Sequence, residues 1–118
     1  MKVIKINNKD YVLKFTSQAI SELNAKGITL VSLSNDMQSM KVSSLYEAFA
    51  CGLKAIQHDM TLEKAYLVID EYFENEENDI EGFFELVLEE YSKSMGLGKI
   101  FKKVMQEQKM KEQKPKTE

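Results

Sequence analysis

The chain has no arginine and no tryptophan, and only one cysteine and one histidine among its 118 residues. All sixteen basic residues are lysine, so the planar fork that arginine offers to guanine edges and phosphates is missing, which argues against sequence-specific DNA recognition. The same bias is also typical of an A/T-rich coding sequence. The single cysteine, Cys51, excludes an intramolecular disulfide and fits a reducing, cytoplasmic compartment.

Long apolar runs and phosphate-binding loops are missing as well. Residues 1–6 lack the apolar core of a signal peptide, and no segment reaches the length of a membrane span. We therefore expect a cytoplasmic protein with no membrane partner. Residues 96–99, Gly-Leu-Gly-Lys, are too short for a phosphate loop and have no strand before them, so no cofactor is expected.

Few residues could perform catalysis. His58 has Asp59 beside it, but adjacent side chains rarely face one another, so we interpret His58 as a residue just past a helix C-terminus. Cys51 could act as a nucleophile only near a histidine, and His58 lies about two helical turns further along, at a different azimuth. Residues 77–82 imitate the first half of a calcium loop, but Leu88 occupies the position that needs a bidentate glutamate. We expect neither catalytic nor metal-binding residues, and hence no enzyme.

Charge is abundant and unevenly distributed. Ten acidic residues and no lysine lie between Asp70 and Glu90, in a stretch that also has helical apolar spacing. This combination predicts a folded, strongly negative surface. Residues 1–98 hold nine lysines and sixteen acids, whereas residues 99–118 hold seven lysines and three glutamates. The two parts could therefore attract one another.

Alternating apolar residues predict a β-hairpin at the N-terminus. Residues 3–6 and 11–15 are two short β-prone runs, and residues 7–10, Asn-Asn-Lys-Asp, suit a tight turn between them. An isolated hairpin is barely stable in water, so helices must cover one of its faces.

Capping residues and 3.6-residue spacing predict four to five helices after the hairpin. Ser17 can cap the first helix, Gly27 can end it, and residues 29–37 can add one or two turns. Two capping boxes, Ser44 with Glu47 and Asn78 with Glu81, begin later helices, and Thr61 caps a helix between them. Their predicted buried faces are Leu45, Ala48, Phe49, Leu53 and Ile56; Leu62, Ala65, Tyr66, Ile69 and Phe73; and Ile80, Phe83, Phe84, Val87 and Tyr91.

The predicted fold class is α+β, predominantly helical, with the hairpin packed on these helices. Residues 1–95 form the compact domain, residues 96–110 a basic amphipathic helix, and residues 111–118 a tail expected to be disordered. The helix can dock on the acidic body or a partner's helix, or mediate self-association, and these fit better than nonspecific nucleic-acid or membrane binding. Its apolar stripe is the candidate partner-binding surface: Leu97, Ile100, Phe101, Val104 and Met105.

Three passages together resemble the tail assembly chaperones of long-tailed bacteriophages and prophages. Residues 6–15, INNKDYVLKF, lead into AISEL at 19–23 and GITL at 27–30. Residues 45–54, LYEAFACGLK, form an apolar helix with a Gly-Leu pair, and residues 61–65, TLEKA, run into IDEY at 69–72 and a further acidic helix. The resemblance covers about residues 3–95 and leaves residues 96–118 outside it.

The resemblance implies a noncatalytic chaperone that binds the tape measure protein, keeps its long hydrophobic helices soluble and recruits tail tube subunits. Such families often make a longer frameshifted product, of which this chain would be the short form. An alternative from another class is an acidic regulatory protein that mimics nucleic acid through residues 70–90 and blocks a DNA-binding partner.

Overall fold

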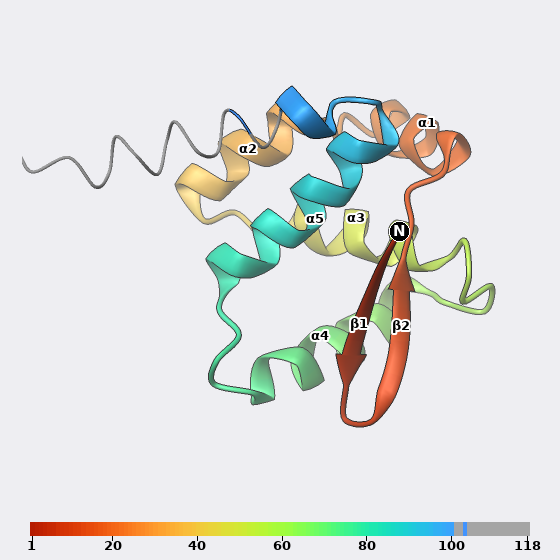
Figure 1. The fold of residues 1–118 in the computed structure, drawn as a ribbon, viewed down its shortest axis with the longest axis vertical. Coiled ribbons are helices and arrows are strands. Elements are labelled where there is room, and N and C mark those ends of the chain that lie inside the picture. Colours follow the sequence, from red (N-terminus) through yellow and green to blue (C-terminus); the bar gives the residue numbers. More distant parts are fainter. Residues whose placement is uncertain (101–102, 104–118) are drawn as a thin grey trace, which may run out of the picture.

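A computed structural model describes residues 1–100 and residue 103 of the chain. An N-terminal hairpin of β1 (Lys2–Ile6) and β2 (Lys9–Leu13) packs on a set of helices, which confirms the predicted α+β, predominantly helical class (Figure 1). The helices are α1 (Ser17–Ala25), α2 (Leu30–Ser39), α3 (Ser43–Leu53), α4 (Leu62–Glu74) and α5 (Ile80–Ser94).

The hairpin turn is tighter than the sequence suggested. Asn7 and Asn8 have φ of 50° and 66°, the left-handed pair that a two-residue turn with the right twist requires. β2 therefore begins already at Lys9, and the antiparallel register runs from Ile6 opposite Lys9 to Lys2 opposite Leu13. The face of the hairpin that the helices cover buries Ile4, Ile6 and Leu13.

β2 is attached to α3 by a close backbone approach. The Lys14 amide donates a hydrogen bond of 2.8 Å to the Gly52 carbonyl. A Cβ on Gly52 would lie 2.5 Å from Leu13 Cδ1 and 2.9 Å from Phe15 Cζ, and both side chains are buried. Only glycine at position 52 lets the hairpin come this near, which gives the Gly-Leu pair of α3 a structural reason.

Side-chain caps begin α1, α2, α4 and α5. The Thr16 hydroxyl, not that of Ser17, accepts the Ala19 amide at 3.1 Å, so the first helix is capped one residue earlier than predicted. Thr29 and Ser32 form a reciprocal capping box that starts α2, and this helix extends past the predicted residues 29–37. Thr61 caps α4 as predicted.

The predicted box of Ser44 with Glu47 is wrong. α3 begins at Ser43 after Val42, without a side-chain cap, so Ser44 lies inside the helix. Glu47 instead forms a salt bridge of 2.9 Å with Lys26 at the end of α1. The Glu47 side chain therefore takes part in a long-range ion pair and not in the helix cap that local spacing predicted.

The predicted box of Asn78 with Glu81 is also wrong, by one residue. Asp79 is the cap of α5, and its carboxylate accepts the Gly82 amide at 2.7 Å. The Asn78 side chain donates to the Tyr72 carbonyl at 2.8 Å and so closes the end of α4.

Aromatic rings fill the core between α3, α4 and α5. The ring of Phe83 lies 4.9 Å from that of Phe49, 5.2 Å from that of Tyr72 and 5.6 Å from that of Phe73, measured between centroids. Such tilted pairs contribute about 0.5–1.5 kcal/mol each beyond the area that they bury. Most of the predicted face residues are buried or partly buried in this core.

Two predicted core residues are exposed. Ile56 is 47% exposed because the regular helix ends at Leu53 and the chain turns before it. Tyr66 is 44% exposed at the margin of α4, where its ring contacts that of Tyr46 edge-on at 6.3 Å. Val68 is buried on α4 instead.

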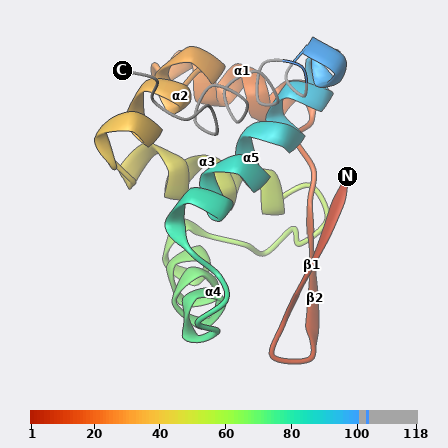
Figure 2. The ribbon, with the colours of Figure 1, turned by 60° about the vertical axis from the view of Figure 1, so that its left-hand side comes forward.

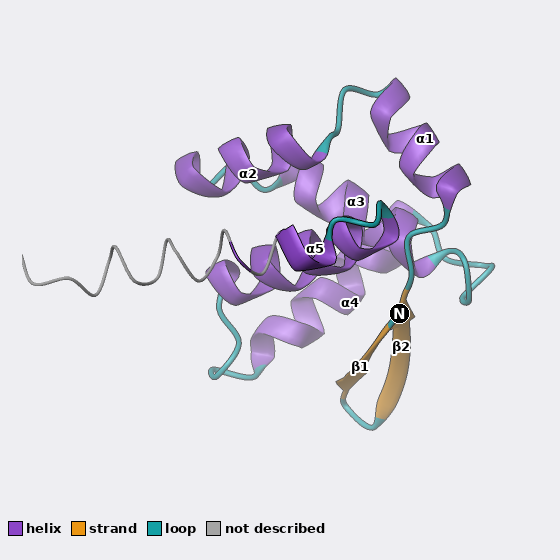
Figure 3. Cartoon of the chain, turned by 45° about the horizontal axis from the view of Figure 1, so that its top comes forward, coloured by secondary structure: helices purple, strands orange, loops and turns teal. Residues whose placement is uncertain are grey.

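α5 contacts both α1 and the segment that follows β2. The Tyr91 hydroxyl donates to Asn24 Oδ1 at 2.8 Å, and its ring lies 5.3 Å from that of Phe15. α5 also packs along α2 and α3, as the tilted view of Figure 3 shows. One residue, Tyr91, therefore links α5 to α1 and to the segment that leaves β2.

We predict that Gly52→Ala destabilises the protein by about 1–3 kcal/mol, the usual cost of overpacking a closed core. The new methyl group would meet Leu13 and Phe15, and because both side chains are buried, they must shift against their neighbours in the core. Urea unfolding followed by circular dichroism measures the change. Ser44→Ala in the same helix is the control and should shift stability by less than about 0.5 kcal/mol. Equal unfolding midpoints for Gly52→Ala and the wild type would contradict the interpretation.

Candidate functional site

The predicted partner-binding stripe is described only at its start. Gly96 has φ of 74°, and the Leu97 amide turns back to donate to the Ser92 carbonyl at 2.8 Å. Leu97 is half-buried, residues 98–100 are helical, and Ile100 is 61% exposed. The other members of the stripe, Phe101, Val104 and Met105, lie outside the described residues, as do residues 111–118.

Eight acids of the acidic run lie on the second half of α4, the loop that connects it to α5, and the first half of α5, segments that follow one another in Figure 2. Of these eight acidic residues, six are exposed. Within residues 1–100, no lysine lies within salt-bridge distance of any of the eight carboxylates. We call this the acidic surface: Asp70, Glu71, Glu74, Glu76, Glu77, Asp79, Glu81 and Glu85.

The last two acids of the run have a structural role instead. Glu90 is buried, and its carboxylate lies 3.0 Å from the Met1 ammonium and 3.5 Å from Lys93 Nζ. Lys93 also pairs with Glu89 at 3.4 Å, and the charges of Glu89 and then Glu90 raise the Lys93 pKa. These contacts hold the start of β1 against α5.

Large apolar side chains remain on the outside of the helices. Val31 on α2, Leu67 on α4 and Ile100 after α5 are each more than 60% exposed. Leu67 follows the exposed Tyr66 and lies three residues before Asp70, so α4 carries apolar and acidic side chains on its outer side. The helix surface can therefore offer both contact area and negative charge to a partner.

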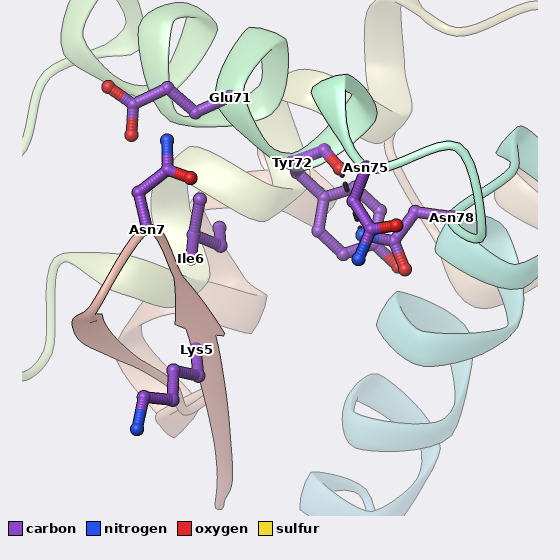
Figure 4. Close-up of a pocket in the computed structure, with 7 residues that line it drawn as sticks. All are labelled: Lys5, Ile6, Asn7, Glu71, Tyr72, Asn75 and Asn78. Carbon is purple, nitrogen blue, oxygen red and sulfur yellow. Dashed lines mark hydrogen bonds between the residues drawn. The ribbon is translucent and has the colours of Figure 1, made fainter.

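A small polar depression of about 80 Å³ lies between the hairpin tip and the end of α4 (Figure 4). The side chains of Asn7 and Glu71 point toward one another across it in Figure 4. Tyr72 forms part of its wall, and burial and then the charge of Asp79 raise the Tyr72 pKa. Its lining residues are Lys5, Ile6, Asn7, Glu71, Tyr72, Asn75 and Asn78.

Cys51 and His58 line the same shallow depression, of about 300 Å³, between α1 and the end of α3. This proximity was not expected, because the sequence suggested different sides of the helix. The Cys51 thiol donates weakly to the Ala19 carbonyl, with the sulfur 3.7 Å from the oxygen. Burial and then the Glu22 charge raise the Cys51 pKa. His58 lies past the end of α3, as expected, and is exposed.

The calcium-like segment at residues 77–82 is used to begin α5, since Asp79 caps that helix. Among the described residues, no group of three or more His, Cys, Asp or Glu side chains is placed to hold a metal ion. In the same part of the chain, no helix is both long enough and apolar enough to cross a membrane.

Known families, curated proteins and solved structures were compared with the chain, and none of them matches it. The resemblance to tail assembly chaperones therefore stays a prediction. The sequence indicated the exposed acids of the acidic surface, but it missed the exposed Tyr66–Leu67 pair, because helical spacing placed Tyr66 in the core.

We predict that Cys51 is a slow nucleophile. A raised pKa leaves less thiolate at neutral pH, so iodoacetamide should alkylate the folded protein about tenfold or more slowly than the urea-unfolded chain. Mass spectrometry across a pH series measures both rates, and the midpoint for the folded protein should lie above that of the unfolded chain. A midpoint below it would indicate a thiolate activated by His58 and would revive the enzymatic hypothesis.

Proposed function

We propose that the protein is a noncatalytic assembly chaperone of a bacteriophage or prophage tail, acting in the host cytoplasm on the tape measure protein. The observation that supports this best is the coexistence of exposed Val31, Leu67 and Ile100 with the acidic surface, whose eight carboxylates have no lysine partner among the described residues. A helix-binding chaperone needs both features, because apolar contact holds the client and charge keeps the loaded complex soluble.

Each exposed apolar side chain would contribute only a modest part of the free energy of binding. Fully burying a side chain such as Leu67 contributes about 2 kcal/mol, so Val31, Leu67 and Ile100 together contribute about 6 kcal/mol at most. Micromolar binding needs about 8 kcal/mol after the entropy loss of association is subtracted, so one copy binds its client only weakly. Weak contacts of this kind suit a chaperone that leaves the finished tail. They also suit repetition along a long client, where many copies act together.

The acidic surface has a second role in the proposal. Chaperone copies arranged along one tape measure protein would repel each other through their acidic surfaces, which discourages clumping of the loaded filament. The same negative surface can attract tail tube subunits that carry a basic patch, and this is how we propose recruitment of the tube begins.

Nucleic-acid mimicry remains a second candidate, because in the part of the chain that the structure describes the acidic surface has no lysine partners, and a DNA-binding protein would recognise such carboxylates. The two functions differ in salt dependence. A complex held by charge should weaken steeply between about 50 and about 300 mM salt, as screening shortens the range of the interaction. A complex held by apolar contacts should change little over that range.

The test is coexpression with a fragment of the tape measure protein from the same genome. We expect the fragment to become soluble with the wild-type chain and to remain mostly insoluble with the triple variant Val31→Ser, Leu67→Ser and Ile100→Ser. These side chains are largely exposed, so each single change should cost under about 0.5 kcal/mol of stability.

The matched control replaces exposed polar residues of the same segments, Asn35→Ser, Glu63→Ser and Lys99→Ser. This control should solubilise the fragment as well as the wild type does. The proposal fails if the fragment is equally insoluble with and without the wild-type chain. If the fragment dissolves but both triple variants act alike, the apolar side chains are not the binding surface.

A further inference from the structure

The two edges of the hairpin differ in how their backbone groups are used. In a hairpin with a two-residue turn, the residues that flank the turn share a pair of hydrogen bonds, and such pairs then alternate along the strands. The flanking residues here are Ile6 and Lys9. It follows that the backbone N–H and C=O groups of Val3 and Lys5 point away from β2, and those of Asp10 and Val12 point away from β1.

The outer edge of β2 is closed by side-chain and backbone contacts. The Val12 amide donates to Gln57 Oε1 at 2.8 Å, and Gln57 Nε2 donates to the Val12 carbonyl at 3.1 Å. The Gln57 amide thus replaces the backbone of a neighbouring strand, and the bond from Lys14 to Gly52 continues the cover. These contacts also confirm which residues of β2 face outward.

The outer edge of β1 has no such cover. Within residues 1–100, no backbone or side-chain group forms a hydrogen bond with the outward N–H or C=O of Val3 and Lys5. Val3 is 55% exposed, and Lys5 is exposed too. Free groups of this kind along a strand edge form a template for another extended chain.

The surroundings of this edge favour a particular chemistry. α4 packs against β1, whereas α3 packs against β2, so a chain that pairs with β1 would run above α4. The polar depression of Figure 4 lies at this place, with Glu71 on its helix side. Glu71 and the neighbouring Glu74 of the acidic surface would favour a lysine or arginine on the inward face of the incoming strand.

We propose that the free edge of β1 binds an extended segment of a partner polypeptide, which adds a third strand to the hairpin and directs a basic side chain toward Glu71. Main-chain hydrogen bonds to Val3 and Lys5 would provide the affinity, and the depression beside Glu71 would provide the specificity. The inference goes beyond the proposed function, because it requires neither a helical client nor a phage tail.

A second copy of the chain fits the edge less well than a single extended segment. α4 packs on β1, so in a symmetric pair of β1 strands the α4 helices of both copies would lie on the same face of the joined sheet and crowd one another beside the joint. Lys2 and Lys5 of the two copies would also gather at the joint, and lysines on edge strands are a known obstacle to such pairing.

The experiment selects random linear peptides of about twelve residues on the full chain and measures their binding by fluorescence anisotropy. Lys5→Pro removes one outward N–H without touching the hydrogen bonds of the hairpin, a position where edge strands accept proline. We expect selected peptides to lose about tenfold or more in affinity on Lys5→Pro. Asp10→Pro is the matched control, since it makes the same change at the paired position on β2, and it should leave binding unchanged.

Further variants separate the contribution of the backbone hydrogen bonds to peptide binding from that of the side-chain charges. Lys5→Thr keeps the N–H and loses the charge, so it should bind like the wild type. Glu71→Gln should weaken peptides that carry an inward lysine or arginine about threefold, the usual size of a partly exposed ion pair. Equal binding of the selected peptides to Lys5→Pro and wild type, or a selection that yields no peptide, would overturn the proposal.

Amide hydrogen exchange in the wild-type protein gives an answer that does not depend on whether the proline variants fold. The Val3 and Lys5 amides should exchange fast in the free protein and become protected when a selected peptide is bound, while Ile4 and Ile6 are protected in both states. Unchanged exchange at Val3 and Lys5 would overturn the proposal. Protection that rises with protein concentration alone would show that the edge binds a second copy, and would overturn the assignment of a partner.

Discussion

The missing side chain at position 52 is the constraint on which the rest of this structure depends. Because Gly52 allows Leu13 and Phe15 to lie directly on the backbone of α3, β2 comes close enough to donate a hydrogen bond to that helix. The docked strand in turn brings Val12 within reach of Gln57. β1 is then left at the outer side, above α4, and so the open edge and the polar depression both follow from one close contact.

Periodicity and capping chemistry were enough to predict the class of the fold, the hairpin and most of the core, because burial of aromatic and aliphatic faces dominates the energy of a chain this size. Local spacing failed where neighbouring residues compete for one role, as Thr16 did with Ser17 and Asp79 with Asn78. It failed again at Glu47, whose partner Lys26 lies 21 residues away. The site was less predictable, because the acids that are solvated and those that are structural have the same sequence pattern. The free edge of β1 appears only once the cover on β2 is known.

The described surface combines features that usually threaten solubility with features that protect it. An uncovered strand edge and exposed aliphatic side chains both invite association. Lysines on β1 and the carboxylates of the acidic surface, which pair with no lysine within residues 1–100, oppose nonspecific association through repulsion. These opposing features would restrict association to partners that match both the shape and the charge of the described surface.

The bond between Tyr91 and Asn24 spans 67 residues, and it has a consequence for how the chain is made. During translation, α1 and the segment after β2 leave the ribosome long before α5 does, so the pocket that receives Phe15 stays incomplete while most of the polypeptide is already outside. Contacts between such distant segments close late and slow the final step of folding. The nascent N-terminal half would therefore remain incompletely packed until the ring of Tyr91 is available to pack on Phe15.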